Sequence, residues 1–134
     1  MAAPLILIAE DDAHQAFLAE RAFRDAGVAE PILAVATGDE AIAALASRPL
    51  PRVVLLDHDL PGRSGLEVLA WIRAQQDLSF LPVLIVSGSS HPSDARAAYL
   101  LGANGYVAKP STYEELARLA RAVAEYWLGF NVSA

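Results

Sequence analysis

Five short, mainly apolar segments constrain the fold of this chain more than any other feature. Each is four residues long and free of charged side chains, and the five span residues 5–8, 32–35, 53–56, 83–86 and 105–108. Short continuous apolar runs are typical of strands buried on both faces, as in a parallel sheet covered by helices. We therefore expect five buried, parallel strands.

The stretches between these segments have the spacing of helices. In residues 13–26, the apolar side chains of Phe17, Leu18, Ala22 and Phe23 recur at helical intervals, and Gly27 follows as a helix C-cap. Four further helices are expected over residues 38–47, 66–75, 93–101 and 112–128. Strand and helix thus alternate five times, which predicts an α/β fold with a doubly wound, five-stranded parallel sheet.

The length and charge of the chain narrow its function. With 134 residues it is most simply one domain over residues 1–134. A net charge of −6 argues against a nucleic-acid binder, which needs clustered cations. There is no cysteine, no signal-peptide pattern and no apolar stretch of the ~18 residues that a membrane span requires. We expect a cytoplasmic protein that binds neither nucleic acid nor membrane.

Acidic residues follow the first apolar segment. In a doubly wound sheet the functional crevice lies beyond the carboxyl ends of the strands. Glu10, Asp11 and Asp12 follow the first expected strand there, and Asp57 follows the third. Carboxylates without a glycine-rich phosphate loop suit a hard divalent cation such as Mg²⁺. A carboxylate beside a cation can also act as a nucleophile and form an aspartyl phosphate.

Two further side chains complete the chemistry expected at this edge. Ser87 follows the fourth strand and supplies a hydroxyl, and Lys109 follows the fifth and supplies an ammonium group. Nucleophile, metal, cation and hydroxyl donor are together what phosphoryl transfer needs. Asp12 has a structural explanation instead, because Asp12 and Gln15 fit a capping box that begins the first helix.

This ordered set resembles the receiver domain of two-component response regulators, over essentially the full length of the chain. The residues that carry the resemblance are Glu10-Asp11, Asp57 with Leu60-Pro61 and Gly65 behind it, Ser87, Gly102-Ala103, Tyr106 and Lys109-Pro110. The resemblance implies a flavodoxin-like sheet with the strand order 2-1-3-4-5. It also implies a phosphoacceptor signalling protein, which promotes its own phosphorylation and dephosphorylation, in place of a conventional enzyme.

The resemblance assigns a role to each acidic residue. Asp57 would accept a phosphoryl group from a phosphohistidine of a sensor histidine kinase. The cofactor would be Mg²⁺, bound directly by Asp11 and Asp57 and through water by Glu10. Asp59 would contribute only its main-chain carbonyl to the metal.

The resemblance also implies a switch. Ser87 and Lys109 would hold the phosphoryl oxygens, and Tyr106 would swing inward as Ser87 moves. Only six residues follow Leu128, too few for a DNA-binding output domain. We therefore expect a stand-alone receiver that signals through a protein contact.

Aromatic residues near the C-terminus predict a partner face. Receivers often dimerise or bind partners through their fourth and fifth helices and fifth strand, and a run of exposed aromatic side chains favours such a contact. The residues expected there are Tyr99, Tyr106, Tyr126, Trp127 and Phe130. Together with the long connection 76–82, this end resembles single-domain regulators that pair with bacterial phytochrome kinases. A homodimer and a bacteriophytochrome kinase are therefore the expected partners.

Two other functions stay open at this point. Residues 57–60 imitate the Asp-x-Asp signature of haloacid-dehalogenase phosphatases, in which Asp57 would be the nucleophile and Asp59 the general acid. That family places its metal-binding acids after the nucleophile, whereas Glu10 and Asp11 precede it. The second alternative is a degenerate receiver that serves only as a docking module. The presence of all five key residues counts against this alternative.

Overall fold

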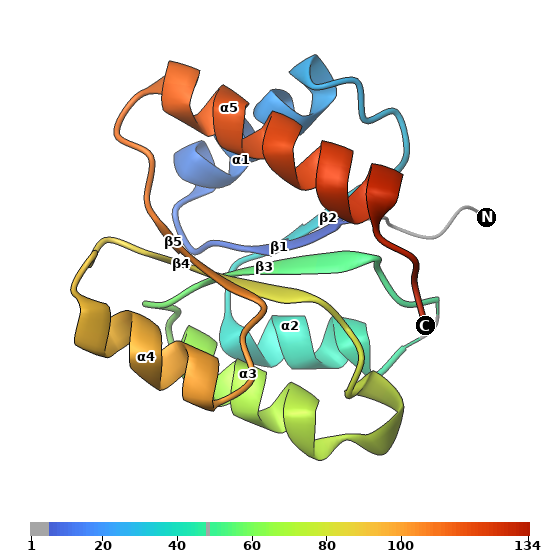
Figure 1. Ribbon diagram of the computed structural model, residues 1–134, viewed down its shortest axis with the longest axis vertical. Helices are drawn as coiled ribbons and strands as arrows, with labels where there is room; N and C mark the ends of the chain where they lie inside the picture. The colour runs from blue at the N-terminus through green and yellow to red at the C-terminus, as the bar shows by residue number, and fades with distance from the viewer. Residues whose placement is uncertain (1–5, 48) are drawn as a thin grey trace.

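The computed structural model describes residues 6–47 and 49–134, and a parallel sheet forms its centre (Figure 1). The strands are β1 (Ile6–Ala9), β2 (Ile32–Val35), β3 (Val53–Asp57), β4 (Val83–Ser87) and β5 (Gly105–Ala108). They lie in the order β2-β1-β3-β4-β5, and each neighbouring pair is parallel, which confirms the predicted topology. The predicted first strand began at Leu5, which lies outside the described residues. Strands β3 and β4 run one residue further than predicted, so Asp57 and Ser87 end them.

In the described residues, four α-helices connect the strands and a fifth follows β5. They are α1 (Ala13–Asp25), α2 (Gly38–Leu45), α3 (Gly65–Ala74), α4 (Pro92–Leu100) and α5 (Tyr113–Val123), with a 3₁₀ turn at Gln76–Leu78. The last helix differs from the prediction: its α-helical part ends at Val123, and wider π-type turns continue over Ala124–Phe130. The prediction missed this change because, over two turns, apolar spacing hardly distinguishes an α-helix from a wider one.

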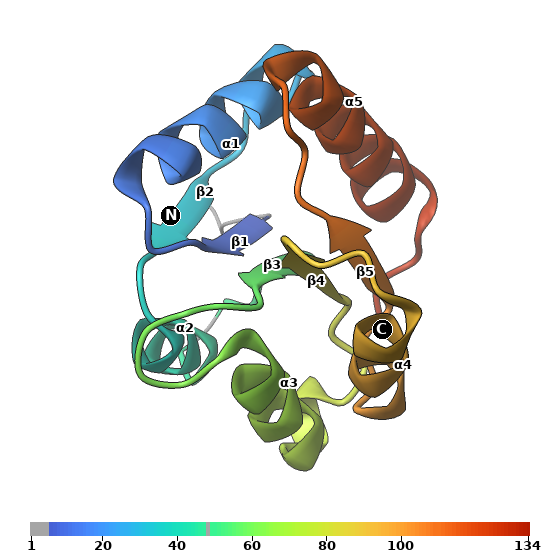
Figure 2. The same cartoon turned by 90° about the vertical axis from the view of Figure 1, so that its left-hand side faces the viewer.

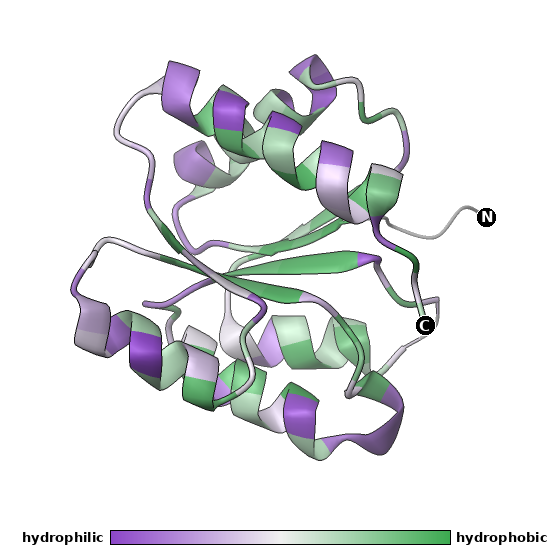
Figure 3. Cartoon of the chain, in the orientation of Figure 1, coloured by the Kyte–Doolittle hydropathy of each residue, from purple (hydrophilic) through white to green (hydrophobic). Residues whose placement is uncertain are grey.

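The helices form a layer on each face of the sheet, α1 and α5 on one side and α2, α3 and α4 on the other (Figures 1 and 2). Successive strand side chains alternate between these layers. Ile6 and Ile8 pack with Phe23 of α1, whereas Leu7 packs with Ile72 of α3. The apolar strands between helices with polar outer surfaces can be followed in Figure 3. This packing removes the strands from water and fixes which strand ends lie side by side.

The expectation of strands buried on both faces holds for the central strands and is wrong for the edge. Every residue of β1 and β3 is buried, but Leu33 and Ala34 of β2 are exposed. Strand β2 has a neighbour on one side only, and the helical layers cover the middle of the sheet better than its margin. Strand β5, at the other edge, is likewise only half-buried.

Asp12 is the N-cap of α1, as the sequence predicted. Its Oδ1 accepts hydrogen bonds from the backbone N–H groups of His14 and Gln15, at 2.9 and 3.0 Å. The predicted capping box is incomplete, because the N–H of Asp12 donates to Glu10 Oε2 at 3.0 Å and not to Gln15. The cap therefore orients Glu10 as well as the helix. Gly27, beyond the C-terminal end of α1, has a φ of 94°, which favours glycine there.

Among the described residues, no helix has both the length and the apolar character that crossing a bilayer requires. The organisation of residues 1–134 as one domain without an output domain stays a prediction.

Candidate functional site

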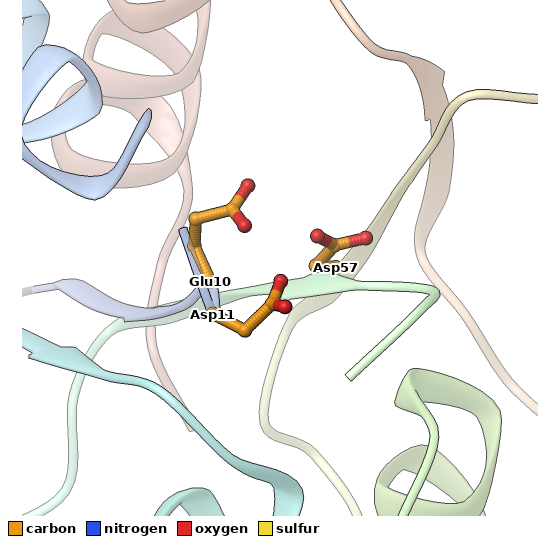
Figure 4. Close-up of side chains that lie close together, drawn as sticks. All are labelled: Glu10, Asp11 and Asp57. Atoms are coloured by element: carbon orange, nitrogen blue, oxygen red, sulfur yellow. The ribbon is translucent and has the colours of Figure 1, made fainter. Parts of the chain in front are cut away.

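Three carboxylates converge at the carboxyl edge of the sheet. Glu10 and Asp11 directly follow β1, and Asp57 ends the neighbouring strand β3. One oxygen from each lies within 4.8 Å of the others, and the three side chains point toward one another (Figure 4). Asp57 is only 3% exposed, whereas Asp11 is exposed to solvent. Such a set of oxygen donors, part buried and part open to water, fits Mg²⁺, which keeps several waters in its coordination shell.

Lys109 completes the site from the far side. Its backbone N–H donates to Ser87 O at 2.7 Å and so ties the residue to the end of β4. Its Nζ lies 2.9 Å from Asp57 Oδ2 and 3.6 Å from Glu10 Oε1. The other Asp57 oxygen, Oδ1, accepts from the backbone N–H of Asp59 at 3.1 Å. Both oxygens of this nearly buried carboxylate are therefore paired and held in a fixed direction.

Asp57 lines a cavity despite its burial. A cavity of about 190 Å³ lies between α1 and α5, lined by apolar residues of the sheet and both helices. Glu10, Asp57 and Lys109 line the same cavity. A group that enters there meets the carboxylate and the ammonium together.

The charges of the site shift two pKa values. Burial raises the pKa of Glu10, and the negative charge of Asp57 raises it further, while the N–H of Asp12 and the charge of Lys109 oppose the shift. Burial tends to lower the pKa of Lys109, but its hydrogen bond and ion pair with Asp57, together with Glu10, outweigh burial and raise it. The lysine therefore stays positively charged at neutral pH. Three acids still outnumber one cation here, so a bound divalent ion would relieve the remaining repulsion.

The raised pKa of Glu10 leads to a prediction about the free energy of unfolding of the metal-free protein. The folded protein holds this proton more tightly than the unfolded chain, so ionised Glu10 lowers the free energy of unfolding at neutral pH. This cost vanishes as the pH falls below the ordinary pKa of glutamate, about 4.3. We expect Glu10→Gln to stabilise the metal-free protein at neutral pH by less than about 1 kcal/mol, and not at about pH 4. Urea unfolding at both pH values measures the difference.

The exposed Glu114 of α5 offers a matched control for this experiment. Glu114→Gln removes the same charge away from the acidic cluster and should leave both free energies within about 0.5 kcal/mol of wild type. Equal destabilisation by Glu10→Gln at both pH values would contradict the electrostatic explanation.

Ser87 and Tyr106 both contact Ser89, a residue that the sequence analysis did not single out. Ser87 is 3% exposed, and its Oγ accepts from the N–H of Ser89 at 3.1 Å. The Tyr106 hydroxyl donates to Ser89 O at 2.8 Å, and the N–H of Tyr106 donates to the hydroxyl of Tyr99 at 3.2 Å. The two residues proposed for the switch are therefore joined through the loop after β4. The repeated serine in Ser87-Gly88-Ser89 was the available signal.

The structure separates the two aspartates of the Asp-x-Asp stretch. The Asp59 side chain is 80% exposed, and its Oδ1 lies 3.1 Å from Nδ1 of the adjacent His58. Among the described acids, the clustered set is Glu10, Asp11 and Asp57, without Asp59. The phosphatase alternative requires a general acid that faces the nucleophile, and the Asp59 side chain does not lie in that position. A contribution of the Asp59 main-chain carbonyl to metal binding stays a prediction.

Gly65 lies directly behind Asp57, and any side chain there would strike the backbone of the site. Its N–H donates to His58 O at 3.0 Å, and a Cβ at this position would lie 2.4 Å from Asp57 O. We expect Gly65→Ala to lower the free energy of unfolding by about 1–3 kcal/mol, because the β3–α3 loop must move. Chemical denaturation measures the loss. Gly88→Ala is the control, since a Cβ there meets no atom within 4 Å; equal losses in both variants would refute the contact.

The fold, the three clustered acids and the lysine agree with one known family. The chain matches the model of the response regulator receiver domain over residues 6–121. This protein belongs to the response regulator receiver family. Receivers are phosphoacceptor signalling proteins, so the assignment favours a signalling role over a haloacid-dehalogenase phosphatase. The acidic cluster also fits the Mg²⁺ cofactor of this family.

Several relatives resemble this receiver over nearly its whole length. It is 38% identical to the probable methanogenesis regulatory protein FilR2 of Methanothrix harundinacea, over 96% of this chain and 86% of that protein. It is 28% identical to the response regulator Rcp1 of Synechocystis sp., over 92% and 88%. The structure of the Mn²⁺-bound form of Rcp1 superposes with a TM-score of 0.87 at 27% identity, covering 98% of this chain and 99% of that one. The phosphorylated cyanobacterial phytochrome response regulator RcpA gives 0.87 at 29% identity, with the same coverage.

The residues predicted for the partner face of this receiver differ in exposure. Tyr99, Tyr126 and Phe130 are exposed, at 51%, 52% and 72%. Trp127 is partly buried against the core formed with α1 and α5, and it makes an edge-to-face contact with Tyr126 at a centroid distance of 4.8 Å. Tyr106 is half-buried. Trp127 thus serves packing, and the exposed aromatics are the ones that remain available for a partner.

Proposed function

We propose that this receiver accepts a phosphoryl group on Asp57 from the phosphohistidine of a sensor histidine kinase and signals through a changed protein surface. The observation that carries the proposal is the Asp57 carboxylate, which is nearly buried, lines a cavity and lies between Lys109 and two further acids. Few other arrangements need a fixed nucleophilic carboxylate beside both a cation and a metal-binding set of oxygens.

In the proposed reaction an Asp57 oxygen attacks phosphorus, the P–N bond to the kinase histidine breaks and an acyl phosphate forms. The leaving imidazole takes up a proton. Lys109 Nζ, 2.9 Å from Asp57 Oδ2, is placed to donate to an oxygen of the transferred group, and the Ser87 hydroxyl would bind another. Mg²⁺ held by Asp11 and Asp57, with Glu10 acting through water, would neutralise charge on the phosphoryl oxygens.

The partners follow from the relatives and from the exposed aromatic residues. Rcp1 and RcpA support a kinase of the phytochrome class as the phosphodonor of this receiver. We further propose that a homodimer forms through the face that includes Tyr99, Tyr126 and Phe130. We also propose that the receiver hydrolyses its own phosphoryl group. We further propose that it is located in the cytoplasm.

The test is direct phosphorylation by a small donor. The purified chain is incubated with acetyl phosphate and Mg²⁺, and intact mass is recorded before and after brief acid treatment. We expect about one acid-labile phosphoryl group per chain. A chain that stays unmodified with Mg²⁺ present would overturn the proposal and favour the docking-only alternative.

A further inference from the structure

Ser89 connects the phosphoacceptor site to helix α4. Its backbone N–H donates to Ser87 Oγ at 3.1 Å, and its carbonyl accepts from the Tyr106 hydroxyl at 2.8 Å. Its own hydroxyl donates to Asp94 Oδ2 at 2.5 Å and accepts from the N–H of His91 at 3.2 Å. Three polar groups of one residue thus contact the proposed phosphoryl-binding hydroxyl, the proposed switch tyrosine and the start of α4.

Asp94 holds Ser89 from within the first turn of α4. An acid in that turn is favourable for the helix by itself. Asp94 has a second interaction, because its carboxylate also accepts a hydrogen bond from a side chain in the preceding loop. Charge-assisted bonds of this kind are short and strong compared with neutral ones. The position of Ser89 therefore depends on where the first turn of α4 lies.

The opposite end of α4 is anchored independently. Arg73 of α3 donates from Nε to Gly102 O at 3.0 Å and from Nη2 to Asn104 Oδ1 at 2.9 Å. It also donates to Leu81 O at 2.8 Å, which ties the same guanidinium to the entrance of β4. With this end fixed, a displacement of Ser89 would move the N-terminal turn of α4 and not the whole helix.

We propose that Asp94 is a positioning residue of the switch and carries a displacement of Ser89 into the first turn of α4. The inference rests on the proposed phosphorylation of Asp57. When the Ser87 hydroxyl turns toward a phosphoryl oxygen, it leaves the N–H of Ser89. Ser89 is then held by its hydrogen bonds with Asp94 and His91 at the start of α4 and with Tyr106, so the loop, the tyrosine and the helical turn move together.

The first experiment measures the resting protein. Amide hydrogen exchange and the Tyr106 ring signals are followed by NMR in the wild-type chain, Asp94→Ala and Asp94→Asn. We expect Asp94→Ala to speed exchange at Ser89 and His91 roughly tenfold and to shift the Tyr106 signals, because the loop loses a hydrogen bond. Asp94→Asn keeps an acceptor oxygen and should restore most of the protection.

Two further variants separate positioning from a general effect on the helix. Ser89→Ala removes the same bond, and with it the acceptor of the His91 N–H, but leaves Asp94 in the first turn. Its exchange at position 89 and its Tyr106 signals should therefore match those of Asp94→Ala. Glu114→Ala removes an acid from the first turn of α5 and should leave the β4–α4 loop as in wild type. Wild-type exchange and Tyr106 signals in Asp94→Ala would overturn the proposal.

The second experiment adds acetyl phosphate and Mg²⁺. In wild type we expect changed exchange over residues 91–95. In Asp94→Ala we expect the same phosphoryl stoichiometry with most of that change lost. A full response of α4 in phosphorylated Asp94→Ala would overturn the proposed role. If wild type gains no phosphate, the function proposed for Asp57 fails, whereas the resting comparison still decides whether Asp94 positions Ser89.

Discussion

Asp57→Asn is expected to abolish phosphorylation of this receiver. An amide in the same position keeps the shape of the side chain but cannot form an acyl phosphate. With acetyl phosphate and Mg²⁺, the intact mass of the variant should stay unchanged, whereas wild type gains about one phosphoryl group. The variant should remain folded, because the amide oxygen can still accept from the Asp59 N–H, while Lys109, which loses the Asp57 Oδ2 acceptor, keeps Glu10 as a neighbour at 3.6 Å.

Asp59→Asn is the matched control for this loss. It removes the other acid of the Asp-x-Asp stretch, whose exposed carboxylate lies outside the cluster of Glu10, Asp11 and Asp57. We expect its phosphoryl stoichiometry to equal that of wild type. Equal labelling of Asp57→Asn and wild type would place the phosphate elsewhere. Steady hydrolysis of a phosphate ester by wild type, lost in Asp59→Asn, would instead support the haloacid-dehalogenase mechanism.

Asp11→Asn is expected to weaken Mg²⁺ binding by roughly 10- to 100-fold, because it removes one of the few charged oxygens that a magnesium site uses. Asp11 is the most exposed member of the acidic cluster, so its loss should cost little stability. Isothermal titration with Mg²⁺ gives the dissociation constants. At limiting Mg²⁺, phosphorylation by acetyl phosphate should slow in proportion to the lost occupancy.

Asp12→Asn tests the neighbouring acid with the same change. Asparagine caps a helix about as well as aspartate, so the bonds from Asp12 Oδ1 to the N–H groups of His14 and Gln15 should survive. We expect the Mg²⁺ dissociation constant to stay within a few-fold of wild type. A larger loss from Asp12→Asn than from Asp11→Asn would exchange the roles of these two residues.

The strands and helices could be predicted because local apolar patterning tracks burial. Segments such as residues 53–56 have no charge to leave in water, and the structure buries them on both faces. The prediction failed where burial depends on neighbours: Leu33 is as apolar as the central strand residues, but the edge strand leaves it exposed. The π-type turns over Ala124–Phe130 were not predicted, because the aromatic spacing there fits more than one type of helix.

The site was predictable as a set of positions and not as a set of contacts. Glu10, Asp11 and Lys109 each follow a mainly apolar segment, and parallel topology brings such positions to one edge. The contacts of Ser89 with Ser87 and Tyr106 depend on the path of the loop after β4. No spacing rule encodes that path, so the repeated serine after β4 was a weak signal and did not predict which groups Ser89 would contact.

The sequence by itself determined which acids precede Asp57 in the chain, and which hydroxyl and which ammonium group follow it. This order was enough to indicate the family. These properties depend only on the order of residues, so the chain has them before it folds. The resemblance implied that Asp57 and not Asp59 is the phosphoacceptor, but only the tertiary structure showed which of the two side chains faces the other acids. Asp57 ends a strand between two neighbours and is buried, while Asp59 lies two residues further, past the sheet, where its carboxylate remains in water. Burial fixes the direction of a side chain, and burial is a property of the packed molecule.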